Sequence, residues 1–242
     1  MSPASSLHRR FVLRKLHSLS GVVPVGVFLV EHLWTNATAL RSQRAFDEAV
    51  DAIQRLPFLP LIEVFGILLP LAFHALYGLV LMRESQPNVA RYPYGRNWLY
   101  VLQRVTGVLT LLFIGWHLYE YRVQKWLFGM STSSFYPTLA AHLSSTWQGL
   151  PVLAIVYALG VAAAVFHFCN GLWGFTASWG VTTSRRAQAR VGLVAGILGA
   201  VLFLVGETTV LYFATGTRFF PTGSDRVDPA TNCRPQNSAE LK

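Results

Sequence analysis

Charged residues are scarce in this sequence of 242 residues, and they make up only 13% of it. Soluble domains carry about 25% charged residues, so this composition argues against a soluble globular protein. Cysteine is also scarce, and Cys169 in an apolar run and Cys233 near the carboxy terminus cannot form a disulfide framework. Basic residues outnumber acidic ones by 20 to 11, but no basic helix or aromatic-basic motif is present. We therefore expect no nucleic-acid partner.

Long apolar runs dominate the chain instead. A helix needs about 20 apolar residues to cross the hydrocarbon core of a bilayer, and five segments are long enough. We expect an all-α integral membrane protein with transmembrane helices at about 17–40, 58–82, 98–126, 148–179 and 191–215. The expected organisation is an amino-terminal segment (1–16), a five-helix domain (17–215) and a polar carboxy-terminal tail (216–242).

The charges between the apolar segments predict the orientation in the membrane. Basic residues gather at the amino terminus and in the second and fourth connections, where Glu84 is the only acidic residue. Because Lys and Arg are enriched in cytoplasmic loops, we expect the amino terminus in the cytoplasm. The same residues make the headgroups of the lipid bilayer a partner.

Two short motifs occur twice, in the same order. LHSLSGV at 16–22 is similar to LQRVTGV at 102–108, and FHALYGL at 73–79 is similar to FHFCNGL at 166–172. The first two segments therefore form a hairpin that the third and fourth repeat. We expect these four helices to form a bundle, with the fifth outside the repeat.

Each of the first four segments contains one deeply placed histidine: His32, His74, His117 and His167. A titratable ring in hydrocarbon is unfavourable unless it has a partner. Helices rise about 1.5 Å per residue, so sequence position can be converted into depth. Since alternate helices run in opposite directions, His74 and His167 are expected near the inner face, and His32 with His117 near the outer face.

Each expected pair provides the two neutral imidazoles that six-coordinate haem iron needs from facing helices. Zinc fits less well, because the histidines divide between two depths and no cysteine or carboxylate joins them. A single intramembrane histidine can also serve only in helix packing. Two axial ligands leave no open position on the iron, so the predicted chemistry is electron transfer through two haems.

Other polar residues lie at the depths of the two pairs. Arg104, Ser18 and Arg14 are candidate partners for the propionates of the inner haem, although arginines can also reach lipid headgroups. His17 is a candidate propionate partner, part of a quinone site, or simply a hydrated interfacial residue. Towards the outer side, Glu63 is the most suggestive carboxyl because apolar residues flank it on both sides.

Four stretches carry a resemblance to a known family: RKLHSLSGVVPVGVFLVEHLW, LPLAFHALYGL, NWLYVLQRVTGVLTLLFIGWHLYEYR and FHFCNGLWGFTASWGVTTSRRAQ. They resemble the dihaem cytochrome b membrane anchor of succinate:menaquinone oxidoreductases, in its single-chain, five-helix form from Gram-positive and related bacteria. The resemblance covers most of residues 10–215, whereas the tail after about Arg218 has no counterpart.

The resemblance implies two haem b groups in a protein of the bacterial cytoplasmic membrane. His74 and His167 would bind the higher-potential haem near an iron–sulfur subunit, and His32 and His117 the distal, lower-potential haem. Succinate would be oxidised by a flavoprotein subunit, because flavin and iron–sulfur motifs do not occur in this sequence. Electrons would then pass through this chain to menaquinone.

The resemblance also implies a menaquinone site beside the distal haem, where Glu63, Glu31 or Trp34 binds the quinone ring or relays protons. A site near Arg14, His17, Ser20 and Arg104 is the alternative. The same fold could serve a fumarate reductase running in reverse. A haem-free transporter or scaffold is the alternative from another class, and it predicts no visible absorption band.

Overall fold

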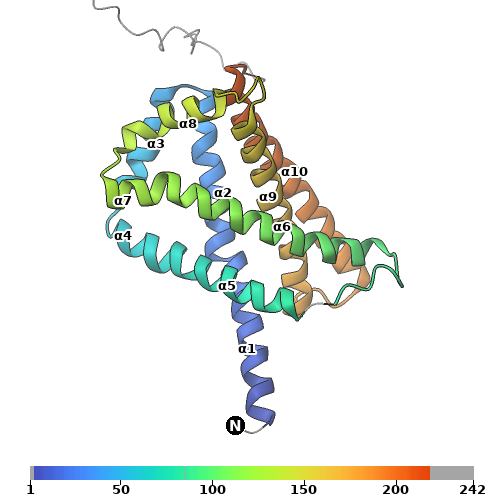
Figure 1. Ribbon diagram of the computed structural model, residues 1–242. Coiled ribbons are helices and arrows are strands. Elements are labelled where there is room, and N and C mark those ends of the chain that lie inside the picture. Colours follow the sequence, from blue (N-terminus) through green and yellow to red (C-terminus); the bar gives the residue numbers. More distant parts are fainter. Residues whose placement is uncertain (1–2, 85, 219–242) are drawn as a thin grey trace, which may run out of the picture.

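The computed structural model describes residues 3–84 and 86–218 (Figure 1). This part of the chain is helical and contains no strand, so the predicted all-α class is confirmed. Five stretches in it are long and apolar enough to cross a membrane: Leu7–Leu40, Leu59–Arg83, Gly95–Phe128, Val152–Ser178 and Arg185–Thr215. They coincide with the five predicted segments. All but the first few residues of the predicted tail lie outside the described residues.

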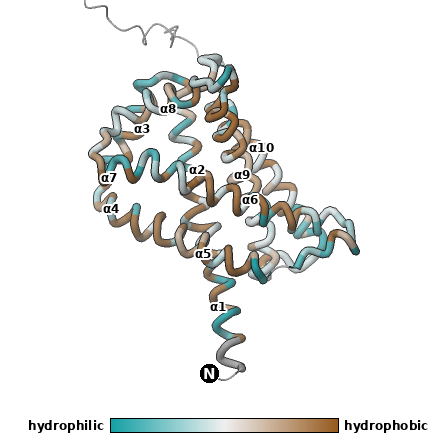
Figure 2. The backbone as a smooth tube through the Cα atoms, viewed as in Figure 1, coloured by the Kyte–Doolittle hydropathy of each residue, from teal (hydrophilic) through white to brown (hydrophobic). Residues whose placement is uncertain are grey.

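Several of the five spans consist of more than one helical element. The elements are α1 (Pro3–Val22) and α2 (Pro24–Ala37); α4 (Leu59–Leu61), η2 (Ile62–Leu68) and α5 (Leu69–Arg83); α6 (Gly95–Leu118), η3 (Tyr119–Val123) and α7 (Gln124–Phe128); α9 (Val152–Ser178); and α10 (Arg185–Thr215). Figure 2 shows hydrophobic colour along the middle of the long helices and hydrophilic colour in the loops that connect them.

The first span is interrupted between α1 and α2. Pro24 has no backbone N–H, so it cannot continue the hydrogen-bond ladder of α1. Helix α1 starts already at Pro3, and the amino-terminal segment expected at 1–16 therefore runs directly into the span. The amino-terminal residues project beyond the other helices in Figure 1.

Two spans contain a π-helical stretch near the same end of the molecule. These stretches are η2, before α5, and η3, after α6. A π-helical turn contains an extra residue, which changes the direction of the side chains that follow. Both stretches carry charged residues, and these residues form part of the site described below.

Side-chain contacts show which connections share an end of the bundle. An ion pair of 2.8 Å between Arg14 and Glu84 joins α1 to the end of α5. The indole N–H of Trp179 donates a 2.9 Å hydrogen bond to Ser18 Oγ, which joins the end of α9 to α1. The amino terminus and the second and fourth connections therefore lie together. We call this the inner end of the bundle and the opposite one the outer end.

Two short helices, α3 (Gln43–Gln54) and α8 (Phe135–Ser144), cover the outer end (Figure 1). Their Phe46 and Tyr136 rings lie 5.7 Å apart, and the hydroxyls of Tyr136 and Tyr212 are 3.1 Å apart. Burial in this contact raises the pKa of the Tyr136 hydroxyl above its ordinary value. These contacts connect α3 and α8, which we call the cap, to the outer end of α10.

The buried core is distributed unevenly between the helices. One cluster of buried residues lies beneath the cap and along the outer parts of α9 and α10, and a second joins α2, α9 and α10. In contrast, the residues of α5 and α6 are at most partly buried by other protein atoms. Helices α9 and α10 therefore provide the packed support against which α2 and α6 lie.

Candidate functional site

The structure brings the four intramembrane histidines together as two pairs. The ring centroids of His74 and His167 lie 6.0 Å apart, and their planes make an angle of 87°. Those of His32 and His117 lie 5.7 Å apart at 76°. Within residues 3–84 and 86–218, no group of three or more His, Cys, Asp or Glu side chains could hold a metal ion. Each site therefore consists of two facing imidazoles.

This separation suits two rings that approach one metal ion from opposite sides. Each metal–nitrogen bond is about 2 Å long, and the ring centroid lies half a ring beyond the nitrogen. Two such ligands on one metal ion therefore place their ring centroids at a separation similar to that observed. Although these rings lie at the centre of the helix arrangement, other side chains do not fully bury them. The donor set and the spacing of both pairs thus fit axial ligation of haem iron.

Backbone carbonyls determine the orientation of the inner pair. Nδ1 of His74 lies 2.8 Å from the carbonyl oxygen of His17, and Nδ1 of His167 lies 3.0 Å from that of Gln103. A carbonyl oxygen can only accept a hydrogen bond, so each Nδ1 carries the proton and donates. In both rings Nε2 is left with its lone pair, which is the form that binds a metal.

The sequence repeat explains why these two hydrogen bonds are alike. His17 and Gln103 occupy equivalent places in the repeated motif, and each is followed four residues later by a glycine. A Cβ atom on Gly21 would lie 2.3 Å from Cε1 of His74, and one on Gly107 would lie 2.9 Å from Cε1 of His167. Both distances are below van der Waals contact, so glycine at these positions lets the ligand rings approach the neighbouring helix.

We expect Gly21→Ala to destabilise the protein by about 1–3 kcal/mol, since overpacking of this size forces neighbouring atoms to move. The His74 ring must shift, so the variant should also have a disturbed inner site. The measurement is thermal unfolding in detergent, together with the visible spectrum. Gly115→Ala is the matched control, because no atom lies within 4 Å of a Cβ added there. Equal behaviour of the two variants would contradict the proposed contact.

Among the other inner residues expected from the sequence, His17 is the one that contacts the pair directly. Its ring stacks on that of His74, with centroids 4.1 Å apart and planes inclined by 8°. Its Nδ1 atom is buried and has no hydrogen-bond partner. Of the inner residues predicted to bind propionates, His17 is therefore the one that contacts the inner histidine pair.

The remaining three inner candidates have their own partners. Arg14 is engaged in the exposed ion pair with Glu84, and Ser18 bonds Trp179 and the backbone of Lys15. The guanidinium of Arg104 lies 3.2 Å from the centroid of the Tyr100 ring on its own helix. However, Nε of Arg104 is buried without a hydrogen-bond partner, so this residue can still donate to an anionic group.

The outer pair has a different set of hydrogen bonds. The hydroxyl of Tyr157 donates to Oε2 of Glu120 at 2.7 Å, and its oxygen lies 3.3 Å from Nδ1 of His117. Because the only hydroxyl hydrogen points to the carboxylate, the oxygen must accept from His117, which again leaves Nε2 with its lone pair. In His32, Nε2 lies 3.4 Å from the side-chain amide of Asn36.

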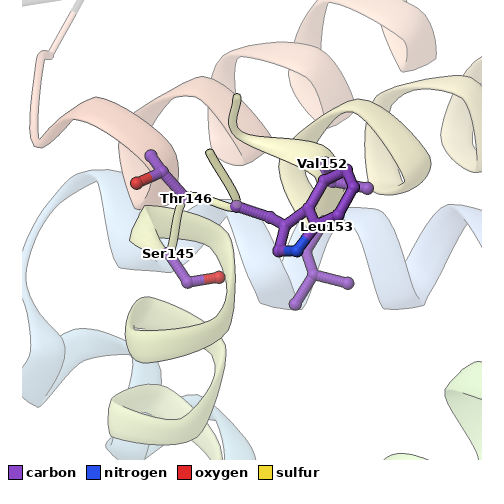
Figure 3. A pocket seen from close by; sticks show the side chains of 5 residues that line it. Ser145, Thr146, Val152 and Leu153 are labelled. Atoms are coloured by element: carbon purple, nitrogen blue, oxygen red, sulfur yellow. The ribbon is translucent and has the colours of Figure 1, made fainter. Parts of the chain in front are cut away.

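The three predicted quinone-site residues do not form one group. Glu63 is only 6% exposed and makes a 2.6 Å ion pair with Arg122, which connects η2 to η3. Glu31 accepts a hydrogen bond from Thr35 and lies with Trp34 along a separate hollow of about 400 Å³. A smaller hollow between α8 and α9, lined among others by Ser145, Thr146, Val152 and Leu153, contains no histidine or carboxylate (Figure 3).

Comparison with known proteins identifies the family. Residues 81–206 match the family model described as succinate dehydrogenase/fumarate reductase transmembrane subunit. The chain belongs to this family. The succinate dehydrogenase cytochrome b558 subunit of Bacillus subtilis (strain 168) is similar to it, with 41% identity over 206 residues. The matched region covers 85% of this chain and 98% of that relative, so the resemblance inferred from the four stretches is confirmed.

In this succinate dehydrogenase/fumarate reductase transmembrane subunit, three further residues near the outer pair are part of the site: Glu120, Arg122 and Tyr157. The sequence places Glu120 with Glu31 and Glu63 in an acidic layer near the outer end. No motif marks Arg122 or Tyr157. The available signal was a carboxylate and a basic residue three and five positions after His117, in an apolar helix.

Proposed function

We propose that this transmembrane subunit holds two haem b groups and passes electrons from an iron–sulfur subunit through them to menaquinone, within a complex that oxidises succinate. The observation that carries the proposal is the presence of two facing histidine pairs. Three of their four rings have Nδ1 engaged by an acceptor and Nε2 left for metal. The name of the Bacillus subtilis relative, a cytochrome b558 subunit, supports the choice of haem b.

His74 and His167 would ligate the inner haem, and His32 and His117 the outer one, through Nε2 in the three rings whose Nδ1 is engaged by an acceptor. When bound, haem b would supply a centre that takes up and releases one electron. Nδ1 of His17 and Nε of Arg104 are buried without hydrogen-bond partners on the inner half, and Nδ1 of His17 donates in the tautomer that carries its proton there. On the outer half Nη1 of Arg122 is in the same situation, and all three can bind anionic propionates.

Succinate oxidation requires flavin and iron–sulfur groups, and no motif for either occurs in this sequence, so other subunits would carry them. We infer that a flavoprotein subunit oxidises succinate and that the iron–sulfur subunit contacts the inner end of this chain. In this arrangement the amino terminus lies in the cytoplasm and the chain crosses the bacterial cytoplasmic membrane. The family also includes fumarate reductases. The same residues would then carry electrons in the opposite direction.

Menaquinone reduction consumes two protons with two electrons, so a protonatable group near the ring is required. Glu63 is the carboxyl that we propose for this role, because it is buried near the outer pair together with a guanidinium. Glu31 and Trp34 line a separate hollow and would act only if the quinone enters there. A site beside His17, Ser20, Arg14 and Arg104 remains the alternative at the inner end.

Redox titration of the purified complex, followed by visible absorption, tests the proposal. We expect two b-type components that titrate separately, each with one electron. A single component would contradict the two-site arrangement. The absence of any band would favour the haem-free transporter or scaffold.

A further inference from the structure

The two histidine pairs differ in what holds their Nδ1 atoms. Both inner rings donate to neutral backbone carbonyls, those of His17 and Gln103. The outer ring of His117 donates instead to a phenol, Tyr157, which is itself hydrogen-bonded to the carboxylate of Glu120. The repeat relates His117 to His32, whose Nε2 lies 3.4 Å from the side-chain amide of Asn36, so the repeat does not extend to this feature.

The carboxylate at the end of this chain of hydrogen bonds is held in a defined position. Its Oε2 atom accepts from Tyr157, and its Oε1 atom lies against Nδ1 of His142 in α8. The side chain of Glu120 is only 10% exposed, whereas that of His142 is 40% exposed. Glu120 belongs to the π-helical stretch η3, which starts two residues after His117.

The Tyr157 ring is fixed as well. It packs edge-to-face against Phe113, Trp116 and His117, with centroid distances of 5.3, 5.4 and 5.8 Å. The residue as a whole is only 5% exposed. Its hydroxyl therefore has little freedom to leave the position between Glu120 and His117.

We propose that Tyr157 and Glu120 are positioning residues that make the outer haem harder to reduce than it would be without a carboxylate hydrogen-bonded to the phenol on His117. A hydrogen bond from a ligand histidine towards a carboxylate makes the ring a stronger donor to the metal. This stabilises the oxidised, more positively charged form of the iron. Because the inner ligands donate to neutral carbonyls, the midpoint potentials of the two sites should differ although both are built from two histidines. The inference rests on the proposed haem function.

The test uses the assembled complex and the midpoint potentials of both components. In Tyr157→Phe the aromatic packing remains and the link to the carboxylate is lost. We expect the reduced-to-oxidised ratio of the outer component to rise about tenfold at a given potential, which corresponds to about 59 mV for one electron. The inner component should stay unchanged.

Glu120→Gln distinguishes charge from geometry, because the glutamine oxygen can still accept from Tyr157 while its negative charge is gone. We expect a shift in the same direction as for Tyr157→Phe. Tyr77→Phe is the matched control: Tyr77 contacts His17 beside the inner pair, with ring centroids 6.0 Å apart, and should leave both potentials in place.

The outcomes separate this inference from the proposed function. If the unmodified complex has two b-type components but Glu120→Gln and Tyr157→Phe shift the outer one no more than Tyr77→Phe does, the inference is wrong and the dihaem function stands. If Tyr157→Phe loses the outer component altogether, the midpoint potential of the outer component in Glu120→Gln decides: a shift supports the inference, and an unchanged potential contradicts it. If the unmodified complex shows no b-type component, both are wrong.

Discussion

We expect the His74→Ala variant to lose one of the two proposed b-type components from the reduced-minus-oxidised spectrum and to keep the other, whereas His117→Ala should lose the second and keep the first. Each substitution removes one of the two imidazoles of a single pair, and the pairs share no ring. Axial ligation is the bond that retains the group, so the affected component should fall to the background level. The proposal of two haems predicts that the haem content of each single variant falls to half that of the unmodified protein.

His167→Ala should reproduce the spectrum of His74→Ala, and His32→Ala that of His117→Ala. His8→Ala is the matched control, because His8 is an exposed histidine at the inner end of α1. A His74 variant that retained both components would show that the pairing does not correspond to two haems. The same conclusion would follow if His74→Ala and His32→Ala removed the same component.

The second large effect is expected at the buried ion pair between Glu63 and Arg122. Arg122→Gln should lower the free energy of unfolding by about 3–5 kcal/mol, because it leaves the buried Glu63 carboxylate without its partner. Glu63→Gln should cost less, since the Arg122 side chain is 26% exposed. The double variant should recover part of this loss, since both charges are then absent. Thermal unfolding of the four proteins of this cycle in detergent gives the coupling energy.

The exposed pair of Arg44 and Glu48 provides the matched control for this cycle. Its atoms approach to a similar 2.8 Å, but the two side chains are 87% and 65% exposed. Solvent screens such pairs, so its coupling should stay below about 1 kcal/mol. If the Glu63–Arg122 coupling is as small, the pair does not hold η2 to η3. Quinone reduction by Glu63→Gln, measured with both b-type components present, separately tests the proposed protonic role.

Hydropathy and helix geometry are enough to predict the membrane spans and the pairing of the histidines from the sequence. Five spans could be predicted because about 20 consecutive apolar residues have no stable place in water. The association of His74 with His167, and of His32 with His117, follows from depth, since a helix has a constant rise per residue. The repeated motif also contains the glycines at 21 and 107, which the structure places against the inner rings.

Tertiary structure alone decided the remainder of the site. The Nδ1 partners of His74 and His167 are backbone carbonyls, which every residue possesses and no motif marks. The π-helical stretches that direct Glu63 and Arg122 towards each other carry no recognisable pattern, because an extra residue per turn depends on the packing of neighbouring helices. Local sequence therefore set which residues lie at which depth, whereas contacts between distant segments set which way each side chain faces and what it touches.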